Sequence, residues 1–362
     1  MSDLPRDVLV SILSRLPAKS LGQFKSVSKY WFSLISSADF VKSHHLRAIS
    51  DTNNNHSRAF IMSTPSMHSV NFESPSCYEG TEDDPKAIVS LKDPLTKDSV
   101  GERLFGSCYG LIYFVCFNEC ILLWNPTTQK TRLIPDPSAS FSGATPFYGL
   151  GYDVSTDDYK MVRASRSVSG QSIRSEVFNL KTGSWRTIHA SQIDIDESDE
   201  IGIFSNGTIH WLIRHVGGSE RRDTILTFDI KKEIFGDISL PNREHEETGF
   251  TWLGDLRGCL YAVCGGDGAD VDVWVMKEYG VENSWSKMIK LNWVEFRCDY
   301  VMLPVCFTLK DEVVIDLDNS WNLVRYNLSE KTIKYFKKCS TDGHDWVMYT
   351  ETLVSPLATC NK

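Results

Sequence analysis

Two cysteine pairs are the first candidates for chemistry, because closely spaced thiolates can bind zinc. Cys116 and Cys120 are separated by three residues, and Cys259 and Cys264 by four. A structural zinc site needs a second pair of cysteines or histidines at comparable spacing, and neither pair has one. The sequence therefore predicts no metal site, and we interpret these thiols as small apolar residues of buried strands.

Three other motifs match catalytic or ion-binding patterns only in part. The segment Gly106–Gly110 lacks the central serine and the following helix of a nucleophile elbow, so we assign its glycines to a tight turn. Asp267, Asp270 and Asp272 lack the downstream glutamate of an EF-hand loop and indicate an acidic hairpin. His210 is interpreted as a strand residue and not as a general base. The sequence predicts no catalytic residue and no cofactor.

The composition describes a folded, acidic chain of 362 residues with a net charge of −9. Hydrophobic residues make up 41% and charged residues 23%, as in globular proteins. The negative charge argues against a nucleic-acid partner, and no apolar run approaches the roughly 18 residues of a membrane-spanning helix. No secretory signal is visible, so we expect reduced cysteines in the cytoplasm, with the nucleus left open as a second compartment.

The first 45 residues have an apolar periodicity that predicts three short helices. After Pro5, apolar residues recur on one helical face as far as Leu16, where Pro17 ends the helix. Ser20 can cap a second helix, and the apolar pattern then continues into a third. A unit this small cannot bury all its apolar side chains, so we expect it to bind a partner.

The order of these residues resembles an F-box. The matching residues run from Leu4-Pro5-Arg-Asp7-Val8-Leu9 through Ile12–Leu21 to Val27-Ser28-Lys29-Tyr-Trp31, and many F-boxes have Glu where Asp7 stands. The resemblance implies an F-box domain over residues 1–45, which binds a SKP-family adaptor and, through it, the cullin and RING subunits of a ubiquitin ligase. The adaptor-binding residues that it implies are Leu4, Pro5, Val8, Leu9, Ile12, Leu13, Leu16, Pro17, Leu21, Val27 and Trp31.

A polar linker is predicted over residues 46–57, and a repeat of about 50 residues follows over residues 58–362. Turn-then-strand positions recur every 48 to 53 residues, and an aromatic residue ends the next strand every 46 to 54 residues. Strands at short spacing also suit a sandwich, but a period near 50 is typical of kelch propellers with four-stranded blades. The two series are Gly110, Asp158, Gly207, Gly258 and Asp311, and Trp124, Phe178, Phe228, Trp274 and Tyr326.

Five repeats are legible between residues 104 and 340, and strand-like runs at 59–62 and 346–349 remain at the two ends. Pairing these runs in one closing blade gives six blades. The predicted fold class is therefore an α+β multidomain protein, with a small three-helix F-box followed by an all-β kelch-like propeller.

Motifs within the repeats resemble the F-box-associated domain of plant F-box proteins. They include Phe105–Ile112, Leu123–Thr127, Tyr148–Asp153, Asp272–Tyr279 and Asn283–Trp285. S-locus F-box and S-locus-F-box-like proteins and F-box/kelch regulators of immune receptors share such motifs. The resemblance implies a non-catalytic substrate-recognition subunit of an SCF-type ubiquitin ligase that directs a client protein to proteasomal degradation. The relatives imply S-locus ribonucleases, and so self-incompatibility, or immune receptors as clients.

Client recognition is expected in the long polar segments 138–146, 191–200, 215–223 and 242–249. Residues 1–50 carry a charge of +4, from seven basic and three acidic residues, which leaves −13 for the remainder. The basic N-terminal part suits an acidic adaptor, and the acidic remainder suits a basic client. Two alternatives stay open, a propeller enzyme with ligands converging on its axis and an F-box scaffold that acts outside a ligase.

Overall fold

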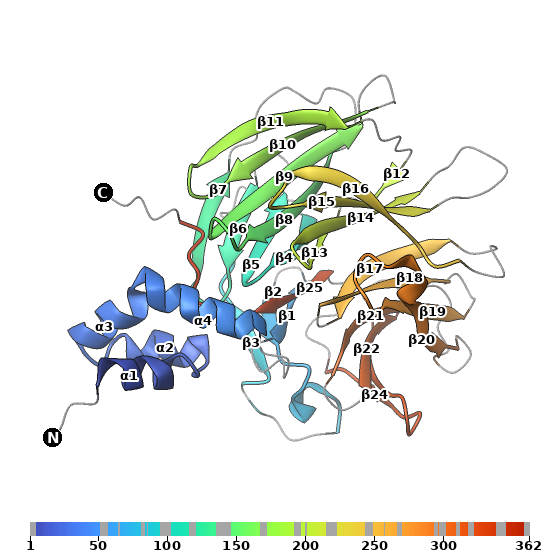
Figure 1. The fold of residues 1–362 in the computed structure, drawn as a ribbon. Helices are drawn as coiled ribbons and strands as arrows, with labels where there is room; N and C mark the ends of the chain where they lie inside the picture. The colour runs from blue at the N-terminus through green and yellow to red at the C-terminus, as the bar shows by residue number, and fades with distance from the viewer. Residues whose placement is uncertain are drawn as a thin grey trace.

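The computed structural model shows a helical N-terminal unit packed against a ring of β-sheets (Figure 1). No helix in the described part of the chain combines the length and the apolar character that crossing a membrane requires. The structure describes residues 5–50, 57–63, 66–80, 84, 86–94, 103–115, 121–134, 146–166, 172–191, 197–199, 201–214, 223–242, 249–256, 258–265, 270–292, 296, 302–308, 312–317, 322–337 and 345–357.

The helical unit has four helices, where the sequence predicted three. Ser28 caps α3 by accepting a hydrogen bond from Trp31 N at 3.1 Å, and Ser37 caps α4 by accepting one from Phe40 N at 3.4 Å. Only Ser37 separates α3 from α4, and α4 continues through residues 46–50 of the expected linker. The four helices are α1 (Arg6–Leu13), α2 (Ala18–Phe24), α3 (Lys29–Ser36) and α4 (Ala38–Ser50).

The described strands form six antiparallel sheets, which are the blades of the predicted propeller. Short 3₁₀ helices lie at Pro75–Cys77 and Glu282–Ser284. The first blade contains β25 (Asp345–Thr350), β1 (Ser57–Ser63), β2 (Ser66–Val70) and β3 (Ile88–Leu91). The second contains β4 (Arg103–Cys108), β5 (Leu111–Val115), β6 (Ile121–Asn125) and β7 (Lys130–Ile134). The third contains β8 (Phe147–Asp153), β9 (Asp158–Arg166), β10 (Ile173–Asn179) and β11 (Ser184–Ser191).

The remaining three blades follow in chain order. In the fourth blade the first-strand position is shared by β12 (Glu197–Ser198) and β13 (Ile203–Ser205), which both pair with β14 (Thr208–Arg214). β15 (Thr224–Asp229) and β16 (Ile234–Ser239) are its third and fourth strands. The fifth contains β17 (Phe250–Leu256), β18 (Cys259–Cys264), β19 (Val271–Met276) and β20 (Trp285–Leu291). The sixth contains β21 (Met302–Phe307), β22 (Glu312–Leu317), β23 (Asn322–Asn327) and β24 (Ile333–Tyr335).

The first blade confirms the predicted closure of the ring. β25, from the C-terminal end of the chain, pairs antiparallel with β1, and Ala59 lies opposite Met348 and Ile61 opposite Trp346. The aromatic series predicted from the sequence lies on the third strand of each of the other five blades. In the turn series, Gly110, Gly207 and Gly258 follow the first strand of their blades, and Asp311 lies outside the described residues.

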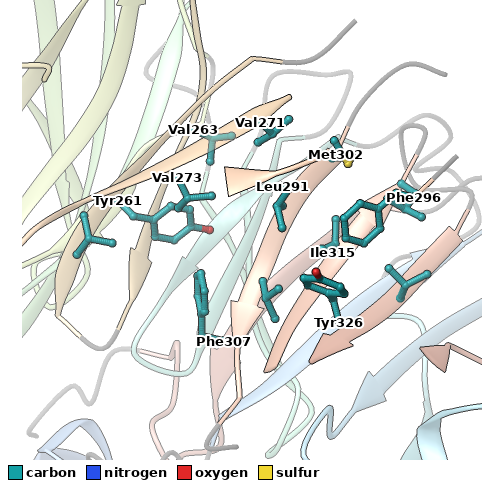
Figure 2. Close-up of a cluster of buried hydrophobic side chains, with 14 residues drawn as sticks. Tyr261, Val263, Val271, Val273, Leu291, Phe296, Met302, Phe307, Ile315 and Tyr326 are labelled. Carbon is teal, nitrogen blue, oxygen red and sulfur yellow. The ribbon is translucent and has the colours of Figure 1, made fainter. Parts of the chain in front are cut away.

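Apolar side chains fill the space between neighbouring blades. Figure 2 shows one such cluster, in which Tyr261 and Val273 from the fifth blade face Phe307 and Ile315 from the sixth. Every residue of β6 and of β8 is buried, because these strands are covered on both faces by adjacent blades. This explains why Ile121–Trp124 of β6 is a continuous apolar run in the sequence and shows no alternation.

In three blades the polar residue after the repeated aromatic has a structural role in the hairpin that follows. Asn125 Oδ1 accepts a hydrogen bond from Thr127 N at 2.8 Å, and Asp229 Oδ1 accepts one from Lys231 N at 2.9 Å. Asn327 Oδ1 accepts in the same way from Ser329 N at 3.0 Å. The side chain thus satisfies backbone donors in the turn between the third and fourth strands, and it does so in three blades.

The chain beyond β25 remains packed against the molecule. Asn125 Nδ2 donates to Val354 O at 2.7 Å, which ties residues 351–357, here the C-terminal segment, to the second blade. Thr352 is fully buried beside Gly110. Leu353, which is 7% exposed, lies in the hydrophobic core of the helical unit. One short segment therefore contacts the closing blade, the second blade and the helices.

We expect Gly110→Ala to destabilise the protein more than Gly207→Ala, by about 1–3 kcal/mol, the usual cost of overpacking. Both glycines have positive φ, +91° and +77°, so both substitutions incur the same kind of backbone strain. A Cβ at Gly110 would overlap Thr352 Oγ1 and lie 2.9 Å from Thr350 O, whereas a Cβ at Gly207 would meet no atom within 4 Å. Urea unfolding of both variants measures the difference. Equal losses would contradict the tight packing of the C-terminal segment.

Candidate functional site

Exposed apolar side chains are concentrated on the helical unit. Among the described residues, thirteen large apolar side chains are exposed, and five of them lie between positions 8 and 32. Val8 and Ile12 are four residues apart on α1 and share one helical face. A grouped set of exposed apolar side chains marks a surface that binds a partner. This exposed apolar set consists of Val8, Ile12, Val27, Tyr30 and Phe32, which are 43%, 48%, 62%, 52% and 57% exposed.

The eleven adaptor-binding residues that the sequence implied differ in how far they are buried. Leu4 lies outside the described residues. Leu9, Leu13 and Leu21 are buried in the core of the helical unit, at 8%, 1% and 0% exposure, and so hold the helices together in this structure. Leu16 and Trp31 are half-buried. The exposed ones are Pro5, Val8, Ile12, Pro17 and Val27.

Tyr30 and Phe32 belong to the exposed apolar set but were missed from the sequence. They flank Trp31 on α3, whose buried face is formed by Leu34 and Ile35. Both are more than half exposed, on either side of the half-buried Trp31. The sequence pattern only continued the apolar run into a third helix and did not separate its exposed from its buried residues.

The same helices carry exposed positive charge. Arg6 and Arg15 flank the exposed side of α1, and Lys19 and Lys29 are exposed on α2 and α3. Lys25 at the end of α2 is half-buried, and its pKa is lowered by burial and by the nearby Lys130 of the propeller. An apolar surface with basic residues around it is complementary to an acidic partner that carries apolar side chains.

Helix α4 attaches the helical unit to the propeller through His45. The imidazole of His45 is 2% exposed, and its centroid lies 5.0 Å from that of Tyr152, 5.8 Å from that of Tyr109 and 6.2 Å from that of Tyr159. Among the described residues, neither ring nitrogen has a hydrogen-bond partner. Burial lowers the His45 pKa to about 4, an effect that Asp157 opposes and His44 strengthens.

A second contact of α4 is electrostatic. Lys42 Nζ lies 3.6 Å from Asp157 Oδ2, and both side chains are more than a third exposed, so this ion pair contributes little to stability. Asp157 belongs to the turn between β8 and β9, next to the tyrosines that surround His45. The helical unit is therefore held mainly by apolar burial, through His45 on one side and Leu353 on the other.

The aspartates and the histidine first considered for chemistry have structural partners where they are described. Asp270 and Asp272 form ion pairs with Lys290 at 2.9 Å and Lys287 at 2.6 Å. His210 is fully buried between Ile203 O at 3.1 Å and Tyr279 Oη at 2.9 Å, as expected of a strand residue. No three His, Cys, Asp or Glu side chains in the described ranges are grouped to hold a metal. Cys116, Cys120 and Asp267 lie outside those ranges.

Comparisons with known proteins agree with both parts of this arrangement. Residues 1–43 match the model of the F-box domain, and residues 58–356 match that of the F-box associated beta propeller domain. An F-box/kelch-repeat protein of Arabidopsis thaliana is 32% identical over 98% of this chain and 96% of its own length. The F-box protein CPR1 of Arabidopsis thaliana is 28% identical over 91% of this chain and 83% of its own.

The described residues form two parts, a helical module with several exposed apolar side chains and a six-bladed propeller, as in a protein that binds partners. The chain belongs to the family of F-box proteins that carry an F-box-associated β-propeller domain. F-box proteins are in general substrate-recognition adaptors and not catalysts, and an F-box in general binds a SKP-type adaptor.

We expect His45→Phe to make the stability of the protein less sensitive to acid. The pKa of His45 is about 4 when folded against 6.5 in the unfolded chain, so the unfolded chain binds the proton first as the pH falls. Stability contributed by neutral His45 is complete above pH 6.5 and decreases towards pH 4, by about 3 kcal/mol. Between pH 7 and pH 4, the free energy of unfolding of the variant should therefore fall by about 3 kcal/mol less than that of the wild type, as measured by urea unfolding.

Above pH 7.5 His45 is neutral in both states, so the stability curves of the two proteins should run parallel there. A variant that loses as much stability in acid as the wild type would show that His45 is not buried at the junction. Burial also lowers the pKa of His210 to about 4. Its effect on the acid sensitivity of stability is the same in the wild type and the variant, so it cancels in the comparison.

Proposed function

We propose that this chain is the substrate-recognition subunit of an SCF-type ubiquitin ligase. Its F-box binds a SKP-family adaptor, and through it the cullin and RING subunits, while the propeller binds a client protein for ubiquitination and proteasomal degradation. The observation that supports this proposal is the exposed apolar set on an F-box whose interior is otherwise closed by Leu9, Leu13 and Leu21.

The chain needs no catalytic residue for this function. Holding a client next to the ubiquitin-conjugating enzyme makes the transfer effectively intramolecular, so local concentration and orientation increase its rate. Orientation is preserved only when the receptor is rigid. The burial of His45 and Leu353 between the F-box and the propeller supports such rigidity.

The client is proposed to bind on the face of the propeller opposite the F-box. α4 contacts Tyr109 and Asp157, in turns that join the first and second strands of their blades. The segments 138–146, 191–200, 215–223 and 242–249 leave from the ends of β7, β11, β14 and β16. In antiparallel blades these strand ends point away from the turns that contact α4. The four segments lie largely outside the described residues.

The acidic charge of the propeller half, −13, supports a basic client in the cytoplasm or nucleus. S-locus ribonucleases and immune receptors are the client classes suggested by the relatives that the sequence resembles.

Co-purification of cross-linked clients, followed by ubiquitination with a reconstituted SKP–cullin–RING assembly, tests this function. A client that is captured but never ubiquitinated would instead support a scaffold that acts outside a ligase.

We expect Val8→Asp combined with Ile12→Asp to reduce binding to a plant SKP-family adaptor by at least about tenfold, as loss of central apolar contacts does at other interfaces. Both side chains are exposed, so the F-box core remains intact in the variant. Binding is measured by titration calorimetry of the full chain. The matched control is Leu133→Asp on β7, a propeller residue that is 62% exposed and should leave binding unchanged.

Replacing Leu13 and Leu16 with charged residues would not separate loss of the docking surface from loss of the F-box fold. Leu13 is 1% exposed within the F-box core, so its replacement is expected to unfold the helices and abolish binding indirectly. The exposed double variant avoids this ambiguity, provided that its circular dichroism matches the wild type. Wild-type affinity in that folded variant would remove Val8 and Ile12 from the docking surface.

A further inference from the structure

The propeller contains a cavity of about 410 Å³ along its axis, and the docking function does not use it. The first strands of several blades line it, including β13, β17, β21 and β25. Ala48 of α4 also lines it, at the side where the exposed turn residues Asn206 and Gly258 are found. The cavity therefore reaches the surface beside the F-box, away from the proposed client face.

Aromatic side chains form much of the cavity wall. Eight of the thirty described lining residues are aromatic. Trp252 and Trp346 lie with ring centroids 5.8 Å apart, and Tyr109 and Phe204 with centroids 5.3 Å apart at an interplanar angle of 86°. All four are only partly buried, so each retains surface that a guest can contact. Aromatic faces attract cations through the negative charge of their π systems.

Among the described residues, the charged side chains of the cavity wall are all acidic. Asp255 and Glu73 line it, and the described lining residues include no lysine, arginine or histidine. Asp255 lies near the end of β17, where Oδ2 accepts from Ser205 Oγ at 2.6 Å and Oδ1 accepts from Gly258 N at 3.1 Å. These two donors fix the carboxylate in place and leave further lone pairs of both oxygens available.

Asp255 is accessible to a ligand, yet its surroundings disfavour the charged carboxylate. The side chain is exposed and lines the cavity, and burial by the surrounding protein raises its pKa despite the hydrogen bonds from Ser205 and Gly258. No ion pair joins Asp255 to a basic residue among the described residues. A carboxylate in such a site is stabilised when a cation enters.

We propose that the axial cavity binds an organic ammonium ion, with the charged nitrogen beside Asp255 and its alkyl substituents against Tyr109, Phe204, Trp252 and Trp346. The volume is within the range of small-molecule sites. A metal ion would require more oxygen ligands than one carboxylate, whereas an alkylammonium uses the aromatic wall as well. The ammonium can come from a free small molecule or from a lysine side chain of another protein.

The test titrates the full chain with choline and, separately, with Nα-acetyl-lysine methylamide. Each cation has a neutral counterpart of similar shape, 3,3-dimethylbutan-1-ol and Nα-acetyl-norleucine methylamide. Affinity is measured by calorimetry and by ligand-observed saturation-transfer NMR. We expect at least one cation to bind at least about tenfold more tightly than its neutral counterpart. Preference for choline identifies a free small cation, and preference for the lysine compound identifies a protein side chain.

Asp255→Asn tests the role of the carboxylate while keeping its shape. The amide oxygen can still accept a hydrogen bond, so the turn at Gly258 is expected to persist, and the preference for the cation should disappear. The matched control is Asp237→Asn, the same change at an exposed position on the outer strand β16, which should retain wild-type affinity. Thermal unfolding and adaptor binding of both variants confirm that fold and F-box are intact.

Three results would overturn the proposal. One is the absence of binding of either cation to the wild type at millimolar concentration, and another is equal binding of the neutral counterparts. The third is undiminished cation binding by a folded Asp255→Asn variant. The first two use the wild-type chain alone, so they hold even if the variant does not fold. None depends on adaptor binding, which keeps this site separate from the proposed docking function.

Discussion

Closure of the ring by β25 and β1 is the constraint on which the rest of the structure depends. An open ring would expose the backbone edge of two strands, and the antiparallel pairing along 57–62 and 345–350 removes both edges. The same pairing determines where the chain goes next. Because β25 ends beside the second blade, residues 351–357 can bury Thr352 at Gly110 and place Leu353 in the F-box core. Propeller closure and F-box attachment are therefore one structural feature.

This coupling has a consequence for the proposed function. An F-box connected by a flexible linker would leave the client with a wide range of positions relative to a ligase. Here α4 runs from the F-box to the propeller, and its His45 is buried among three tyrosines. The exposed apolar set is thus held in a defined relation to the opposite face of the propeller. Pre-organisation of this kind reduces the entropy lost when a client is positioned.

The sequence predicted the features that repeat and missed those that depend on contacts between distant segments. Trp124 and Phe228 belong to a series that recurs every 46 to 54 residues because each blade has the same strand pattern, so each repeat supported the interpretation of the others. The insertion of Leu353 among Leu9 and Leu13 has no local signal, since a partner more than 300 residues away determines it. The break at Ser37 was missed because one capping serine interrupts an otherwise continuous apolar pattern. The cavity exists only once the blades are assembled.

The treatment of charge elsewhere in the propeller shows why Asp255 stands apart. Lys160 is 4% exposed and is matched by Asp153 at 2.9 Å, Glu233 at 2.8 Å and the carbonyl of Ile230 at 2.9 Å. Arg325, at 5% exposure, has Glu312 at 3.4 Å and the Tyr78 ring at 4.1 Å. In both cases the fold supplies the opposite charge, because an unpaired charge inside a protein is costly. Asp255 is more exposed than Lys160 and Arg325, and among the described residues its hydrogen-bond donors are the neutral Ser205 and Gly258, at the wall of an aromatic lumen. A site that provides every component for holding a cation except the cation itself is complementary to a ligand that brings that charge.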